Sequence, residues 1–282
     1  AGQDFDPATG RIKAANLLVE LFVEELPPKA LKKLGEAFAA ALAESLVAQG
    51  LADAKAAVMH FASPRRLGVH VEAVLACAAD KPVSTKLMPV SVGLDADGKA
   101  TPALLKRLAA LGADDSAVAN LRRAADGKNE ALFHDSIAPG TTLTDGLQRA
   151  LEAAMARLPI PKVMTYQLAD GWSSVNFVRP VHGLVALHGA DVVPISALGL
   201  QAGRETQGHR FEARVSPLPI TSADSYASQL KDDGAVIPGF AERRAEIVRQ
   251  LQAAAAPSGL KPIEDDALLD EVAGKMQAVL ES

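Results

Sequence analysis

The alternation of hydrophobic and polar positions is clearest near the start of the chain. Between Asn16 and Leu26 the side chains alternate with a period of two, which predicts a β-strand. Pro27 and Pro28 end this strand and suit the first turn of a helix. Five apolar residues then recur at spacings of three and four, which predicts an amphipathic helix closed by Gly50. They are Leu31, Leu34, Phe38, Leu42 and Leu46.

A second patterned stretch, residues 171–211, contains the most unusual residue types of the chain. It holds the single Trp and three of the six His, together with an Arg-Pro pair and a Gly-His-Arg-Phe sequence. Apolar residues alternate from Val175 to Leu187, which predicts a strand. Gly189-Ala190-Asp191 follows as a turn before another apolar run, so we expect a half-buried antiparallel hairpin here.

The rest of the pattern predicts a mixture of strands and helices. Thr101 and Pro102 suit the N-cap and first position of a helix, whereas residues 78–101 are predicted to be a loop. The other strands are expected at 56–62, 67–73 and 131–137, and the helices at 102–111, 143–158, 222–232 and 240–255. Because the two types of element do not alternate strictly, we predict an α+β fold with mixed or antiparallel sheets and packed amphipathic helices.

The domain organisation is expected to follow this pattern. Residues 1–15 lack any period and are predicted to be a disordered leader or an expression remnant. Residues 16–252 form the predicted α+β region, with a division into two subdomains near 78–101. Residues 253–282 are predicted to be a linker followed by a C-terminal helix.

Composition narrows the functional classes. The 282 residues are 49% hydrophobic and carry a formal net charge of −5, so the chain can build a core but has no global attraction for nucleic acid. The single Cys77 excludes an internal disulfide and suits a cytoplasmic protein. No run approaches the roughly 18 apolar residues of a membrane helix, so no membrane insertion is expected.

The sequence predicts no catalytic and no metal-binding residues. Residues 203–210 have the glycine spacing of a phosphate loop, but His209 and Arg210 stand where Lys and Ser or Thr are needed. His182 and His188 on one strand would lie about 20 Å apart, too far to share a metal. His134-Asp135 is an isolated pair, for which a turn at the end of a strand is the simpler interpretation.

The arginines are the more suggestive residues. Arg65, Arg66, Arg179, Arg204 and Arg210 would form a cationic patch only if folding gathered them on one surface, and ordinary surface salt bridges are the equal alternative. Arg244 falls on the apolar stripe of the predicted helix 240–255. It therefore requires a partner, as a structural or interface residue, and Arg244→Ala is expected to be far more destabilising than Arg243→Ala.

Five strings of the sequence, taken in order, resemble the N-terminal part of the β subunit of bacterial tetrameric (α2β2) glycyl-tRNA synthetase, from about Asn16 to about Glu271. They are LLVELFVEELPPKALKKLGEAF, SPRRLGV, IPKVMTYQLADGWSSVNFVRPVHGLVALHG, GRETQGHRF and SADSYASQLKDDGAVIPGFAERR. After Glu271 the pattern is lost, which suggests a truncated subunit.

The resemblance implies a role in forming glycyl-tRNA in the cytoplasm. It places glycine activation, with ATP and Mg, on a separate α subunit, and it implies tRNA-Gly as a second partner and allows a β–β contact. This chain itself is expected to bind no cofactor and to make no glycyl-adenylate alone. The fold is implied to be similar to a module of the phenylalanyl-tRNA synthetase β subunit.

Two hypotheses follow. The first is a tRNA- and subunit-binding part of glycine-tRNA ligase, with Arg65, Arg66, Arg179, Arg204, His209 and Arg210 as RNA-binding residues and no catalytic residues of its own. The alternative is a freestanding, non-catalytic α+β scaffold or regulatory RNA-binding protein derived from that subunit.

Overall fold

The computed structural model describes residues 4–158, 164–167, 174–177, 181–262 and 265–276. The chain divides into two compact units. Unit 1 consists of residues 1–78 and 141–282, and unit 2 consists of residues 79–140. Unit 2 is thus inserted into unit 1 between Ala78 and Thr141.

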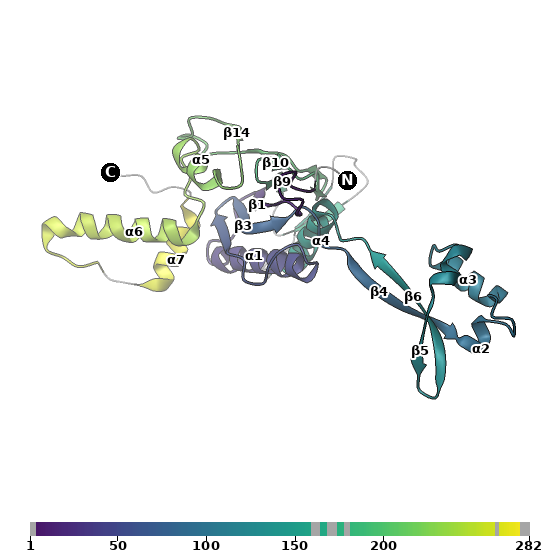
Figure 1. Cartoon of the computed structure of the whole chain (residues 1–282). Helices are drawn as coiled ribbons and strands as arrows, with labels where there is room; N and C mark the ends of the chain where they lie inside the picture. The colour runs from purple at the N-terminus through teal and green to yellow at the C-terminus, as the bar shows by residue number, and fades with distance from the viewer. Residues whose placement is uncertain (1–3, 159–163, 168–173, 178–180, 263–264, 277–282) are drawn as a thin grey trace. The chain divides into compact units, whose positions relative to one another are not determined.

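Strand β1 (Ala14–Val23) lies in the middle of the five-stranded antiparallel sheet of unit 1 (Figure 1). The strand order is β10-β9-β1-β3-β2. In register, Val19 of β1 pairs with Val69 on one side and Ala186 on the other. The remaining strands are β2 (Val58–Ser63), β3 (Arg66–Leu75), β9 (Val181–His188) and β10 (Asp191–Val192).

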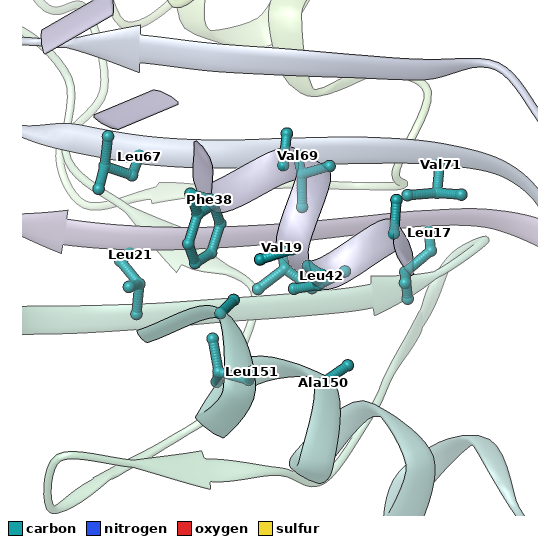
Figure 2. Packing of buried hydrophobic residues seen from close by; sticks show 14 of the residues in the cluster. Leu17, Val19, Leu21, Phe38, Leu42, Leu67, Val69, Val71, Ala150 and Leu151 are labelled. Atoms are coloured by element: carbon teal, nitrogen blue, oxygen red, sulfur yellow. The ribbon is translucent and has the colours of Figure 1, made fainter. Parts of the chain in front are cut away.

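One face of this sheet packs against two helices, α1 (Leu31–Ala48) and α4 (Leu143–Ala156). Alternate residues of β1 point to this face, and Figure 2 shows them meeting α1 and α4. Each buried Leu or Phe there contributes about 1.5–3 kcal/mol relative to an exposed position. The labelled residues include Leu17, Val19 and Leu21 of β1, Phe38 and Leu42 of α1, and Leu151 of α4, all fully buried. The predicted strand and the predicted helix ending near Gly50 are both confirmed.

The other face of the sheet is also covered, so the prediction of a half-buried hairpin is wrong. Leu18, Val185 and Leu187 pack there beneath α5 (Tyr226–Asp232) and its neighbouring segments. The ring of Tyr226 meets Phe61 edge-on, with 4.9 Å between centroids. A sheet buried on both faces can enclose polar groups, and this one does.

The hairpin itself differs from the prediction in one further way. The alternation between residues 175 and 187 belongs to two strands, because β8 (Ser174–Phe177) pairs with β7 (Met164–Gln167) and β9 pairs with β1. The predicted turn is confirmed, since Gly189 adopts φ +61° between β9 and β10.

Short strand pairs follow this turn. Strand β11 (Ser196–Ala197) pairs with β12 (Leu200–Gln201), and β13 (Glu205–Thr206) pairs with β14 (Leu218–Pro219). The β13–β14 pair leaves a long connection between its strands, residues 207–217.

The C-terminal segment belongs to unit 1. Helix α6 (Phe240–Ala255) leads through a 3-10 turn (Ala256–Ser258) to α7 (Asp266–Lys275), which packs on α6 and contacts α1 and β2. A side chain at Gly274 would clash with the backbone of Pro28, so α7 packs closely on the start of α1. At the other end, an antiparallel bridge joins Phe5 and Ile12 within the segment predicted to be a leader.

Unit 2 has a small core of its own. Strands β4 (Lys81–Pro89), β5 (Arg122–Asp126) and β6 (Asn129–Ala138) form a sheet in the order β4-β6-β5. Leu132 packs against Leu104 and Leu108 of α3 (Pro102–Ala110). A 3-10 helix (Asp115–Asn120) completes the unit. The predicted N-cap is confirmed, since Thr101 Oγ1 accepts the N–H of Leu104 at 3.4 Å.

The predicted loop at 78–101 is wrong, because it contains β4 and the short helix α2 (Val90–Gly93). Most of β4 is solvent-exposed, so it lacks the apolar alternation of a half-buried strand. With its mixture of helices and antiparallel sheets, the chain confirms the predicted α+β class. No helix in the described part of the chain combines the length and apolar character needed to cross a membrane.

Candidate nucleic-acid interface

The connection between β13 and β14, residues 207–217, is the most promising binding surface of unit 1. This 207–217 loop reads QGHRFEARVSP and contains two arginines and one glutamate. It carries Arg210 and Phe211 at the surface, and the Phe211 side chain is 80% exposed. Three sets of contacts fix the loop: a buried ion pair at its base, backbone hydrogen bonds along it, and a histidine-capped turn at its tip.

The buried ion pair joins Glu20 of β1 to Arg66 of β3. Both side chains are almost fully buried, at 1% and 0% exposure, and Arg66 Nε lies 3.4 Å from Glu20 Oε2. The Arg66 guanidinium also donates to the backbone carbonyl of Gln207, the first residue of the loop. Glu20 in turn accepts hydrogen bonds from the hydroxyls of Thr206 and Tyr226. The pair therefore ties β1, β3, β13 and α5 to the base of the loop.

Burial at this base raises the pKa of the Tyr226 hydroxyl well above its usual value. The largest cause is burial, and the second is the negative charge of Glu20, whose oxygen Tyr226 contacts. Tyr226 therefore keeps its proton, and its hydroxyl donates a hydrogen bond to Glu20. A carboxylate held by two hydroxyls and a guanidinium is well satisfied, which is what makes a buried charge tolerable.

Backbone contacts hold the middle of the loop against the end of α5. The N–H of His209 donates to Gly234 O at 2.6 Å, and that of Arg214 donates to Asp233 O at 2.7 Å. Gly208 is required at this approach, because an added Cβ would lie 2.7 Å from Gly234 O. The backbone of the loop is therefore held against the end of α5, while most of its side chains are exposed.

The tip of the loop is a turn capped by a histidine ring. His209 Nδ1 accepts the backbone N–H groups of Phe211 at 3.3 Å and Glu212 at 3.2 Å. These two hydrogen bonds close the turn through the Nδ1 side of the ring. The Arg210 guanidinium sits 5.5 Å from the centroid of the Phe211 ring. The turn thus presents a cation and an aromatic ring together at the surface.

Among the described residues, the other members of the predicted RNA-binding set make their contacts away from the tip of this turn. A guanidinium that solvent cannot reach cannot contact a phosphate, so the expectation for Arg66 is corrected to a structural role. Arg66 is also the first residue of β3 rather than part of the connection between strands. Arg204 is half-buried and donates to the carbonyls of Ala190, Ile220 and Thr221, at 2.9, 3.2 and 3.4 Å, and its RNA-binding role stays a prediction.

Arg65 belongs to a different group of side chains. It is partly exposed, lies over the ring of Phe22 and is 4.0 Å from Glu24, which also contacts His182 at 2.6 Å. Arg179 lies outside the described residues. Among the described members of the predicted set, His209 and Arg210 therefore share one surface and Arg210 is the exposed cation.

The sequence pattern placed Arg244 on the apolar stripe of α6, but the structure buries its neighbour Arg243 instead. Arg243, not Arg244, is the fully buried residue of the helix, and it donates to the carbonyls of Ala62, Ile237, Gly239 and Ala273. Arg244 does have carboxylate partners, Asp270 at 2.8 Å and Asp266 at 2.6 Å, but its side chain is 28% exposed.

Four further residues of this site are not predicted by the sequence pattern: Glu20, Thr206, Tyr226 and Phe211. Glu20 had a detectable signal, because it is a charged residue between Leu18 and Phe22 on one face of a strongly apolar strand. Such a charge predicts a buried partner. In the described part of the chain, no three side chains of His, Cys, Asp or Glu come close enough together to hold a metal ion.

Comparison with known proteins identifies the family. The family model described as glycyl-tRNA synthetase beta subunit matches residues 17–277. A glycine–tRNA ligase beta subunit from Thiobacillus denitrificans is 76% identical over 258 residues, which are 92% of this chain and 37% of that protein. Those from Dechloromonas aromatica and Leptothrix cholodnii are 68% and 72% identical, covering 93% and 91% of this chain and 38% and 36% of theirs. The chain thus spans about 37% of the length of these relatives, and it belongs to the glycyl-tRNA synthetase beta subunit family.

Proposed function

We propose that this chain is the tRNA- and subunit-binding part of a cytoplasmic glycine–tRNA ligase, and that the 207–217 loop of unit 1 contacts the tRNA. The observation that carries the proposal is the fixed presentation of Arg210 and Phe211 at the tip of that loop. A guanidinium held on a rigid turn loses little conformational entropy when it binds a phosphate. The buried base of the loop is consistent with a surface that must keep its shape.

Glycine activation, in this proposal, belongs to a separate α subunit that supplies the sites for ATP and Mg. In the described residues no group of three or more His, Cys, Asp or Glu could hold a metal, and the loop at 203–210 lacks the Lys and Ser or Thr of a phosphate-binding loop. The β chain would then hold the tRNA and the α subunit together, with a β–β contact in the heterotetramer. We also propose that its α+β fold is similar to the module of the phenylalanyl-tRNA synthetase β subunit.

The test is the binding of a tRNA-Gly transcript to the chain, followed by fluorescence anisotropy over a range of salt concentrations. Arg210→Ala should weaken binding and lower the slope of log affinity against log salt by about one, because one phosphate contact is lost. Arg157→Ala is the matched control, since Arg157 is also an exposed arginine but is paired with Glu44. Equal effects of the two substitutions would contradict the assignment to the loop.

The purified chain also tests the proposal that glycine activation belongs to the α subunit. ATP–pyrophosphate exchange dependent on glycine should stay at background for the isolated chain and appear when α subunit is added. Exchange by the isolated chain that a point substitution within it abolishes would overturn the proposal.

A further inference from the structure

Phe211 stands out among the apolar side chains of the molecule. Among the described residues no large apolar side chain is more exposed, and its 80% exposure contrasts with the buried Phe38 and Phe240. Leaving such a ring in water forgoes the stabilisation that burial gives. Mobility does not account for the exposure, because the backbone around Phe211 is fixed at both ends and at its turn.

The fixed backbone prepares the ring for a partner. The N–H of Phe211 donates to His209 Nδ1. On either side of Phe211, the N–H of His209 donates to Gly234 O and the N–H of Arg214 donates to Asp233 O. Since Gly208 also lies in close contact with Gly234, the turn has little freedom to move the ring away from the surface. Binding a planar ligand against Phe211 would therefore require little additional ordering.

The surroundings of the ring indicate what kind of partner fits it. Arg210 lies over the ring, Arg214 is exposed four residues further on, and Glu212 is the one acid of the loop. A protein interface would be expected to place further apolar side chains beside such a ring. In this loop the only other large apolar side chain is Val215, which is 42% exposed. A ring next to the Arg210 guanidinium and 6.3 Å from the His209 ring, with a second exposed arginine in the same loop, matches a flat base joined to phosphates better than an apolar protein surface.

We infer that Phe211 stacks on an unpaired RNA base while Arg210 and Arg214 contact the adjoining phosphates, an inference that rests on the proposed binding of tRNA. The face of a base is free for stacking only in a loop, a bulge or a single-stranded end. The 207–217 loop would therefore select single-stranded segments of the tRNA, and its specificity would come from stacking rather than from reading a base edge.

The experiment compares two probes on the 282-residue chain: a short single-stranded RNA containing a fluorescent adenine analogue, and a blunt duplex of the same strand. Binding of the single strand should quench the analogue. Phe211→Ala should abolish the quenching and weaken single-strand binding about tenfold, within the range that base–aromatic stacking gives. The salt slope should be unchanged, because no charge is removed.

Matched variants separate stacking from other effects. Phe211→Tyr should keep the affinity, and Phe211→Leu should lose it, because leucine keeps apolar bulk without an aromatic face. Val215→Ala removes apolar area from the same loop and should change nothing. Thermal unfolding midpoints should be unchanged in all four variants, since both side chains are surface-exposed.

Four results would overturn the inference, and they distinguish it from the proposed function. If Arg210→Ala weakens RNA binding and Phe211→Ala does not, stacking is wrong and tRNA binding by the loop stands. An equal loss on single strand and duplex also removes stacking. If Phe211→Ala leaves RNA binding intact but prevents capture by the α subunit, the ring belongs to a protein interface. If the unchanged chain binds no RNA, the proposed function and this inference fall together.

Discussion

The guanidinium of Arg243 connects three parts of unit 1 through backbone oxygens. Its acceptors are Ala62 at the end of β2, Ile237 and Gly239 before α6, and Ala273 in α7, with three of the distances between 2.7 and 2.8 Å. Burial, and secondly the charge of Arg66, lower the pKa of Arg243 to about 10, which still leaves it charged at neutral pH. In the described structure its charge is met by carbonyl dipoles rather than by a carboxylate.

Removing this side chain should be costly. Arg243→Ala leaves buried carbonyls without donors, so we expect the free energy of unfolding to fall by about 3 kcal/mol or more. Arg244→Ala removes partly exposed ion pairs and should lower it by about 1 kcal/mol or less. Urea denaturation of the two variants measures the difference. Equal and small effects would show that the carbonyl contacts of Arg243 do not persist in solution.

The loop at 207–217 shows how one element depends on charges placed elsewhere in the sequence. Its base is fixed by Glu20 and Arg66, which come from strands far earlier in the chain and from the face of β1 opposite α1. Because Arg66 contacts the first residue of the loop, the strength of the ion pair and the position of the tip are coupled. This coupling can be measured separately from overall stability.

Glu20→Gln should therefore both destabilise unit 1 and loosen the loop. Removing one charge of a buried pair costs about 3–5 kcal/mol, because it leaves the other charge uncompensated. Hydrogen exchange should speed up at the amides of His209 and Arg214, which the loop shields by backbone bonds. A Glu20→Gln, Arg66→Met double substitution serves as the control, and it should recover part of the stability but not the protection of the loop. Unchanged exchange in both variants would contradict the anchoring role.

The elements also show where sequence patterns are informative and where they are ambiguous. Strand β1 and helix α1 were predictable, because one face of each is continuously apolar. In α6, Phe240, Arg243 and Ile247 are spaced by three and four, whereas Phe240, Arg244 and Ile247 are spaced by four and three. Both series follow one helix face, so the pattern alone could not choose the buried arginine.

The candidate site was less predictable than the fold. The Gly-His-Arg-Phe sequence marked the segment that forms the exposed loop, but the contacts of Arg66 and Arg204 involve residues distant in sequence or backbone carbonyls. Backbone acceptors leave no trace in the pattern of side chains. Exposure of Phe211 is equally invisible from the sequence, because a phenylalanine between an arginine and a glutamate is as compatible with a core position as with a surface turn.

At the scale of the whole molecule, the chain passes from unit 1 into unit 2 after Ala78 and returns to unit 1 at Thr141, and these two residues are neighbours in space. The N–H of Ala78 donates to Thr141 O at 2.8 Å, and Cys77 and Thr142 form an antiparallel bridge. Both contacts lie within unit 1. The core clusters are likewise separate, since Leu104, Leu108 and Leu132 form a cluster within unit 2.

Unit 1 should accordingly fold without residues 79–140. Replacing them by a short Gly-Ser linker between Ala78 and Thr141 should preserve a cooperative thermal transition, measured by circular dichroism, because the junction residues are already hydrogen-bonded neighbours. Deleting α7 is the contrasting control, since it removes the Ala273 carbonyl that Arg243 binds. Loss of the cooperative transition in the first variant would show that unit 2 is needed for the fold of unit 1.

The closed junction at Ala78 and Thr141 has a consequence for how this chain can change over evolutionary time. The entropy needed to close a loop grows only with the logarithm of its length, so doubling the inserted segment costs about 0.6 kcal/mol. Insertions, deletions or the exchange of the whole segment at this junction would leave the register of the main sheet untouched. The junction is therefore a point at which the chain can take up a change in length, or gain a new surface, without disturbing the strands on either side.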